Sequence, residues 1–247
     1  MLEAAVTYDQ ALPAADKAAI FKTMTKVIAQ RYGWIATFMA KINTQQQGHS
    51  GHIHLSLRDL ANESVFYDEK APYHMSDTMR HFVAGQLHYM PELLAMVAPT
   101  INSFSRLVPG HWAPTQANWG YDNRTTALRV IGGKASSQRV EYRVPGADSN
   151  PYLAIAAALA SGLWGIEQQL ELPEPISCNA YQQPMNQQLQ LPRNLWEAAQ
   201  RLKQCQPARQ WFGDVFVDDY AAKCEWEVQE NQRQITDWQL ERYFELA

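Results

Sequence analysis

The chain has 247 residues, 46% of them hydrophobic and 19% charged, and its formal net charge of -4 argues against a nucleic-acid-binding surface. No apolar run approaches the ~20 residues that a membrane span requires, and no segment resembles a signal peptide. The three cysteines lack CxxC spacing and are odd in number, so we expect reduced thiols in a cytoplasmic protein that binds neither nucleic acid nor membrane.

The first part of the chain predicts two helices with two strands between them. Apolar residues recur at helical spacing over 13–31. The apolar and aromatic segment 34–40 predicts a strand, and 52–57 alternates strictly between polar and aliphatic residues, which predicts another. A second helix is expected over 76–94, with Ser76 or its neighbour as the N-cap.

The second part predicts a long loop, two strands and further helices. Residues 98–116 hold three prolines and predict a loop, and loops of this length in compact domains often carry function. Strands are expected over 125–131 and 138–144, and a buried helix over 151–167. A surface segment rich in Pro and Gln is expected over 172–192. Three amphipathic helices are expected after it: 195–204, 214–229 and 236–244.

Two of the expected strands present polar side chains on one face and apolar side chains on the other. The polar faces carry His52, His54 and Ser56, and Arg139, Glu141 and Arg143. A face of this kind is often only solvated. Carboxylate and imidazole are nevertheless ligands of divalent metals, and guanidinium groups bind phosphate oxygens in bidentate fashion.

Further arginines lie close by in the sequence. Arg106 lies in the expected loop, and Arg124 and Arg129 lie on or beside the strand that follows. These arginines alternate with apolar residues instead of forming a charged run, which indicates a polyanion-binding cavity. The residues alone therefore favour an enzyme that handles a metal ion and a small phosphorylated ligand such as ATP.

Three ordered segments resemble the signatures of the glutamine synthetase family. They are 48–57 (GHSGHIHLSL), 102–110 (NSFSRLVPG) with 123–125 (NRT), and 139–153 (RVEYRVPGADSNPYL). The resemblance spans most of the chain and weakens after about residue 171. It implies an α/β (α+β) fold in which a curved antiparallel sheet lines the active site and helices pack outside it. It also implies that 1–247 is the C-terminal portion of the catalytic domain.

The resemblance implies an ATP-dependent ligase of nitrogen metabolism. Such enzymes phosphorylate the γ-carboxylate of glutamate, and ammonia or an amine such as a polyamine then attacks the acyl phosphate. Mg²⁺ or Mn²⁺ ions and arginines stabilise the transferring phosphoryl group. Full-length relatives form rings, which implies a homo-oligomer.

The resemblance also assigns roles to individual positions on the metal and glutamate side. It implies that His52 and Glu141 bind the metal that bridges the ATP phosphates, and that Glu3 binds a second ion beside glutamate and the amine. Gly48 is implied to contact glutamate through its backbone, although a glycine here also suits a simple turn. Arg106 is implied to bind the α-carboxylate of glutamate.

On the phosphate side, Arg124 and Arg143 are implied to act as catalytic residues that contact the γ-phosphoryl group or the acyl phosphate. Nucleotide contacts are implied for His54, Ser56, Arg129, Arg139 and Tyr8. Two of these, Ser56 and Tyr8, suit packing roles equally well, and Arg129 also suits a structural ion pair.

Trp112 departs from the family pattern. Relatives that use ammonia carry a glutamate two residues after the Pro-Gly pair of this loop, whereas this chain has Trp112 two residues after Gly110. An indole offers a cation–π face but takes no proton. The departure favours a substrate-binding role for Trp112 and an amine larger than ammonia, although a gate without a substrate role is an alternative.

The family's N-terminal β-grasp domain and first metal-binding strand have no counterpart in this sequence. We therefore expect a fragment that is inactive alone. One alternative is a non-catalytic glutamine synthetase-like protein with a structural or regulatory role. Another is a phosphagen-type guanidino kinase, which shares the chemistry of ATP, arginine and glutamate but gives no reason for the His-x-His pattern.

Overall fold

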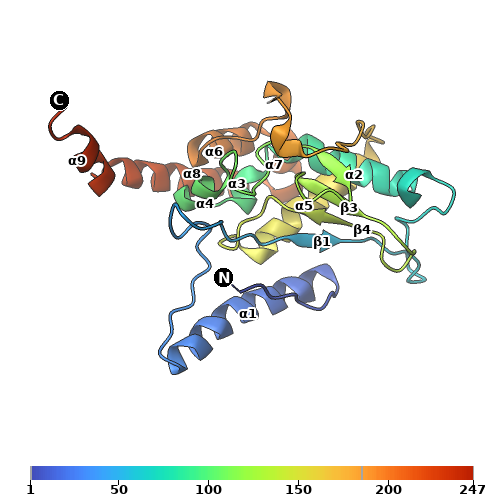
Figure 1. Cartoon of the computed structure of the whole chain (residues 1–247). Coiled ribbons are helices and arrows are strands. Elements are labelled where there is room, and N and C mark those ends of the chain that lie inside the picture. The colour runs from blue at the N-terminus through green and yellow to red at the C-terminus, as the bar shows by residue number, and fades with distance from the viewer. Residues whose placement is uncertain (1, 185, 247) are drawn as a thin grey trace.

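The computed structural model describes residues 2–184 and 186–246 and shows a mixed α/β arrangement (Figure 1). Helices pack against a small sheet, and α1 lies apart from the rest of the molecule. This confirms the expected fold class, in which helices cover a sheet.

The sheet has four strands in the order β1-β4-β3-β2. Their bounds are β1 Ile53–Leu55, β2 Trp119–Tyr121, β3 Leu128–Ile131 and β4 Arg139–Tyr142. The pairs β1–β4 and β3–β4 are antiparallel, as expected, whereas β2 pairs parallel with β3, so the sheet is mixed. The sequence did not predict β2, because three residues are too few to show alternation.

One face of the sheet packs on the core. Leu128, Val130, Val140 and Tyr142 are all nearly inaccessible and belong to one apolar cluster with residues of α2 and α5. The alternation of each strand then directs the intervening residues to the opposite face. The apolar positions of β3 and β4 therefore determine which side chains reach the site.

Helices α2 and α5 pack directly against each other behind the sheet. Helix α2 begins after Ser76, whose hydroxyl accepts a hydrogen bond from the backbone of Met79. Helix α5 begins after Asn150, whose side chain accepts from two backbone N–H groups, and Pro151 occupies its first turn. The cap at Ser76 agrees with the sequence prediction, and α5 begins and ends at the predicted residues 151 and 167.

The remaining helices lie around this pair. The α-helices are α1 Ala11–Arg31, α2 Asp77–Tyr89, α3 Leu94–Val97, α4 Ile101–Arg106, α5 Pro151–Glu167, α6 Leu195–Gln204, α7 Gln206–Phe212, α8 Asp214–Gln232 and α9 Asp237–Tyr243. The short 3-10 helices are η1 Pro72–His74, η2 Ala180–Gln182 and η3 Gln187–Leu189.

Two sequence predictions for individual segments were wrong, and one helix was not predicted. Residues 34–40 form no strand; the described part of the chain offers them no pairing strand, and Trp34 and Ile35 are exposed. The expected loop 98–116 contains α4, a six-residue helix capped by Thr100 and Ser103. Helix α7 was missed, because its seven residues span too few turns to show periodicity.

Helix α1 stands apart from the other helices and contacts the body through α5 (Figure 1). Its Lys22 donates a hydrogen bond to the carbonyl of Ser149, and Tyr152 of α5 donates to Asp16. Within the two described ranges, no helix combines the length and apolar character that crossing a bilayer would require.

Candidate active site

The candidate site is built on the polar face of the sheet, where three strands place polar residues side by side. In the register, His54 of β1 lies opposite Glu141 of β4, and Glu141 lies opposite Arg129 of β3. Directly opposed residues on one face of a sheet are near neighbours, so the pairing alone brings an imidazole, a carboxylate and a guanidinium together. The polar strands predicted from the sequence therefore do meet in one place.

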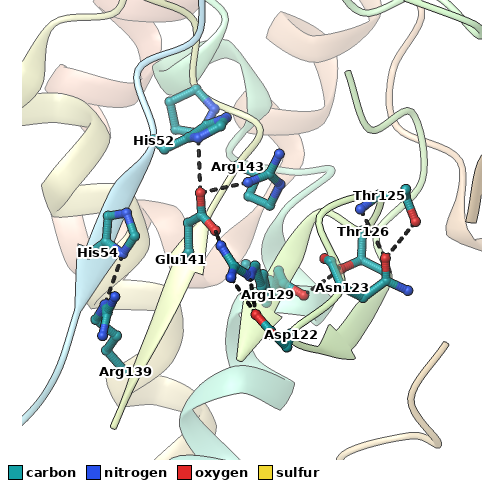
Figure 2. Close-up of polar contacts among 12 residues, drawn as sticks. His52, His54, Asp122, Asn123, Thr125, Thr126, Arg129, Arg139, Glu141 and Arg143 are labelled. Carbon is teal, nitrogen blue, oxygen red and sulfur yellow. Dashed lines mark hydrogen bonds and ion pairs between the residues drawn. The ribbon is translucent and has the colours of Figure 1, made fainter. Parts of the chain in front are cut away.

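Glu141 is the centre of this cluster (Figure 2). Its Oε1 accepts a hydrogen bond from Nη1 of Arg143 at 2.6 Å and lies 3.0 Å from Nδ1 of His52. Its Oε2 accepts from Nη1 of Arg129 at 3.2 Å. Only 5% of the Glu141 side chain is exposed, so one nearly buried carboxylate joins three basic groups.

The environment of Glu141 keeps it ionised. Burial acts to raise the pKa of its carboxyl group, but the hydrogen bond with His52 and the charge of Arg143 outweigh burial and lower the pKa to about 2. The carboxylate is therefore ionised at neutral pH, and its neighbours already stabilise its charge. Glu141 can therefore orient arginines or contribute to a metal site without first losing a proton.

His52 presents its other ring nitrogen away from this contact. In the hydrogen-bonded arrangement Nδ1 donates to Glu141, so a neutral imidazole carries its lone pair on Nε2. A histidine oriented in this way by a carboxylate is a common arrangement at metal sites.

Arg129 bridges Glu141 and a residue that the sequence analysis did not select. Its Nε donates to Oδ1 of Asp122 at 2.9 Å, and Nη2 forms an ion pair with the same oxygen. Burial acts to lower the pKa of Arg129, while the bonds to Asp122 and Glu141 raise it. The structural ion pair considered for Arg129 is therefore present, and Asp122 was overlooked because a single aspartate before a strand gives no recognisable pattern.

His54 and Arg139 form a second contact at the edge of the cluster (Figure 2). Nε of Arg139 donates to Nδ1 of His54 at 3.2 Å, and Nη1 donates to the carbonyl of Ser137 at 2.8 Å. Burial lowers the pKa of His54, opposed by the charge of Glu141 and reinforced by that of Arg139. Neutral His54 therefore accepts the bond from Arg139, and the two residues expected on the nucleotide side do lie together.

Arg106 lies beneath this surface instead of projecting from it. It is 3% exposed, and its guanidinium donates to the carbonyls of Arg143, Val144 and Pro145. Burial lowers the pKa of Arg106 to about 10, which still leaves it charged at neutral pH. In this arrangement Arg106 holds the backbone that follows β4.

Gly48 packs against that same arginine. A Cβ added to Gly48 would lie 2.6 Å from Cγ of Arg106 and 2.8 Å from the carbonyl oxygen of Ala40. The absence of a side chain at Gly48 thus allows the chain to approach Arg106 closely. Its implied backbone contact to glutamate stays a prediction.

The other selected residues lie outside the Glu141 cluster. Glu3 and Tyr8 are exposed on the segment before α1, and Ser56 is exposed beyond the end of β1. Arg124 is exposed in the loop between β2 and β3. Trp112 is 63% exposed and packs edge-on with Tyr181, another residue that the sequence analysis did not select.

The donor set suits a divalent ion shared with phosphate oxygens. Within the described ranges, no three His, Cys, Asp or Glu side chains gather closely enough to enclose a metal ion, and Glu3 does not join His52 and Glu141. Mg²⁺ is usually bound by one or two carboxylates together with substrate phosphates and waters. The nitrogen of His52 and the carboxylate of Glu141 fit that kind of partial site.

Comparisons with known proteins identify the family to which the chain belongs. Residues 1–243 match the family described as "Glutamine synthetase, catalytic domain". The chain is 46% identical over 248 residues to type-1 glutamine synthetase 2 of Dictyostelium discoideum, covering 99% of this chain and 47% of that protein. It is 42% identical over 241 residues to a glutamate–isopropylamine ligase of a Pseudomonas species, covering 98% of this chain and 52% of that protein.

Solved structures show the same similarity. GmaS without ligand superposes with a TM-score of 0.86 at 31% identity, over 97% of this chain and 55% of GmaS. A GmaS complex with ADP gives a TM-score of 0.87 at 32% identity, over 96% of this chain and 56% of that one. The chain thus spans about half the length of the relatives that it matches.

Proposed function

Because the chain belongs to the glutamine synthetase catalytic-domain family, we propose that it forms the catalytic part of an ATP-dependent ligase that joins the γ-carboxylate of glutamate to an amine. The observation that carries the proposal is Glu141, which brings His52, Arg129 and Arg143 together on one face of the sheet. A cluster of this kind combines metal-binding and phosphate-binding groups, which ADP-forming ligation requires.

The proposed reaction has two steps. A γ-carboxylate oxygen of glutamate attacks the γ-phosphorus of ATP, and ADP leaves. The amine nitrogen then attacks the carbonyl carbon of γ-glutamyl phosphate, loses a proton, and phosphate leaves.

Each part of the cluster has a role in this scheme. Arg143, fixed by Glu141, and Arg124, exposed in the β2–β3 loop, stabilise the negative charge of the transferring phosphoryl group. Arg139 and His54, with Arg129, Ser56 and Tyr8, serve the nucleotide. A Mg²⁺ or Mn²⁺ ion held by His52 and Glu141, with a second ion at Glu3, would neutralise phosphate charge.

Glutamate lies on the other side of the phosphoryl group in this scheme. Gly48 contacts it through the backbone and Arg106 attracts its α-carboxylate, while Arg106 also holds the strand that carries Arg143. The amine approaches past Trp112, whose exposed indole suits an alkylammonium better than it suits ammonia. Relatives that include a glutamate–isopropylamine ligase and a gamma-glutamylethanolamide synthetase of Streptomyces coelicolor support an amine substrate.

The test is a substrate panel with the complete protein that contains this chain. ADP release from ATP is measured with glutamate and, in turn, ammonia, ethanolamine, isopropylamine and putrescine, and the γ-glutamyl product is identified by mass spectrometry. We expect glutamate-dependent ADP release with at least one alkylamine, and its loss in Glu141→Gln. Absence of turnover with every amine would contradict the ligase and favour a structural or regulatory protein.

A further inference from the structure

The chain after α5 returns to the site and is fastened to the loop that carries Arg124. Nδ2 of Asn123 donates to the carbonyls of Ile176 and Cys178, each at 2.9 Å. The backbone N–H of Ala180 donates to Oγ1 of Thr125 at 2.8 Å. The 3-10 helix η2 is therefore held beside the candidate site, although the sequence predicted only a surface segment here.

Tyr181, in the middle of η2, contacts Trp112 edge-to-face. Their ring centroids are 6.0 Å apart, and the ring planes meet at 75°. The backbone of Trp112 has φ 54°, a left-handed conformation that a bulky residue rarely adopts. The preceding His111 lies 3.2 Å, through Nδ1, from Nζ of the buried Lys41, which helps to hold this conformation. The two aromatic rings thus form a fixed corner with much of the indole exposed.

The hydroxyl of Tyr181 lies near enough to Arg143 and Arg106 for their charges to act on it. It is buried and finds no hydrogen-bond partner among the described residues, and the same is true of Nε of Arg143. Burial raises the pKa of Tyr181, while the charges of Arg143 and Arg106 act in the opposite direction. A buried hydroxyl without a partner is costly, and a ligand that bonds to it relieves that cost.

We infer that Tyr181 and Trp112 form the binding site for the amine substrate, with the two rings flanking its alkyl group and the Tyr181 hydroxyl accepting a hydrogen bond from its nitrogen. The inference rests on the proposed ligase function and adds the substrate class, a small primary alkylamine. Aromatic walls bury methylene groups, so they suit the alkyl group of an amine.

The corner also predicts the direction of specificity. Burial of each methylene group is expected to lower the KM about fourfold. The enzyme should therefore prefer isopropylamine and ethylamine to methylamine, and methylamine to ammonia. Tyr181 acts here as a specificity-determining residue, because it binds the nucleophile and takes no part in phosphoryl transfer.

The test is steady-state kinetics of the complete protein with isopropylamine, ethylamine, methylamine and ammonia. Tyr181→Ala is expected to raise the KM for isopropylamine at least tenfold and to leave the KM values for glutamate and ATP within twofold. Tyr181→Phe keeps the ring and removes the hydroxyl, so we expect the KM for isopropylamine to rise about fivefold. Trp112→Ala should weaken the preference for isopropylamine over ammonia. Tyr32→Ala, at an exposed tyrosine after α1, is the matched control and should change none of these values.

The outcomes separate the inference from the proposed function. An unchanged amine KM in both Tyr181 variants, or a parallel rise in the glutamate KM, overturns the inference and leaves the ligase intact. If the unmodified protein turns over ammonia and no alkylamine, the inference is also overturned and the ligase function is kept. If the unmodified protein shows no turnover with any amine, both the inference and the proposed ligase function are overturned. If Tyr181→Ala does not fold, as judged by circular dichroism, Tyr181→Phe decides the matter alone.

Discussion

Glu141 satisfies more basic groups than any other single carboxylate in the described part of the chain. Its two oxygens are shared among His52, Arg129 and Arg143, and the pKa of about 2 reflects those contacts acting against burial. Arg143 is itself 8% exposed, and Glu141 is its ion partner, so removing Glu141 leaves a buried guanidinium without a carboxylate. Interactions of this kind stabilise the fold and the site together.

We expect Glu141→Gln to destabilise the chain by about 2 kcal/mol at pH 7, because the uncharged amide leaves Arg143 buried without an ion partner. The folded-state pKa of about 2 lies below the usual 4.5. The stabilisation is therefore complete above about pH 5.5 and is lost as the pH falls from about 5 to 2. Urea unfolding of both proteins at several pH values measures this, and a stability difference that does not shrink at low pH would contradict it.

Arg106 and Arg124 offer a contrast between a buried and an exposed arginine. Arg106 donates to three backbone carbonyls, whereas Arg124 is exposed beside the β2–β3 loop. We expect Arg106→Lys to lower the free energy of unfolding by about 1–3 kcal/mol, because an ammonium group cannot span the three carbonyls. The matched change Arg124→Lys should alter stability by less than about 0.5 kcal/mol. Urea denaturation compares the two, and equal losses would show that Arg106 does not hold this backbone.

The sequence predicted the individual site residues that lie on or next to regular strands. Alternation in 52–57 and 138–144 placed His52 with His54 and Glu141 with Arg143 on common faces, and the sheet pairs those faces. Asp122 and Tyr181 were missed, because each reaches the site through a loop or a 3-10 helix. Alternation does not extend into such segments, and hydrogen bonds between distant parts of the chain determine where their side chains lie.

The contact between α2 and α5 depends on two facing glycines. A Cβ on Gly165 would lie 2.2 Å from the carbonyl oxygen of His81 and 2.7 Å from Cα of Gly85. Backbone atoms cannot move aside as a flexible side chain can, so the two helices must separate to admit even a methyl group. The spacing behind the sheet is therefore set by residues without side chains.

We expect Gly165→Ala to lower the free energy of unfolding by about 1–3 kcal/mol, although alanine favours a helix by about 1 kcal/mol over glycine. Leu163→Ala, at a half-exposed position of the same helix, is the comparison and should cost less than about 1 kcal/mol. Thermal unfolding followed by circular dichroism gives both values. A stabilised Gly165→Ala variant would show that the helices are not in close contact here.

Helices could be predicted from the sequence where they are long and their apolar residues recur periodically. The sequence predicted 195–204 as a helix, and α6 has those bounds, while α8 runs three residues beyond the predicted end at 229. Residues 34–40 were misassigned, because apolar and aromatic composition favours a strand but pairing requires a partner. Helix α4 was missed, although Thr100 and Ser103 cap each other, because its six residues make too few turns for periodicity.

Apolar side chains remain exposed at both ends of the molecule. On the N-terminal side they belong to α1 and the segment after it, and on the C-terminal side to α8, α9 and their surroundings. They are Leu12, Ile20, Met24, Ile28, Trp34 and Ile35, and Trp226, Trp238, Phe244 and Leu246. Exposed apolar patches commonly mark surfaces of protein–protein contact. The homo-oligomer that the family resemblance implies stays a prediction.

We expect the 247-residue chain alone to show no glutamate-dependent ligation. Of the three residues implied as metal ligands, only His52 and Glu141 come together, while Glu3 is exposed before α1. Incubation with Mg-ATP, glutamate and isopropylamine, with ADP measured against the complete protein, tests this. Robust turnover by the chain alone would show that the chemistry needs no residues beyond it.

Because α1 lies apart from the other helices, the exposed segment that follows it is accessible to proteases. Residues 42–47 are all exposed, and the described hydrogen bonds of their backbone N–H groups stay within that segment. A brief exposure to subtilisin is therefore expected to cut there first, as seen by mass spectrometry of the fragments, and a first cut within α5 or the sheet would contradict this. After such a nick α1 would be retained chiefly by its contact with α5, so the chain would come apart in two stages, with α1 leaving before the sheet unfolds.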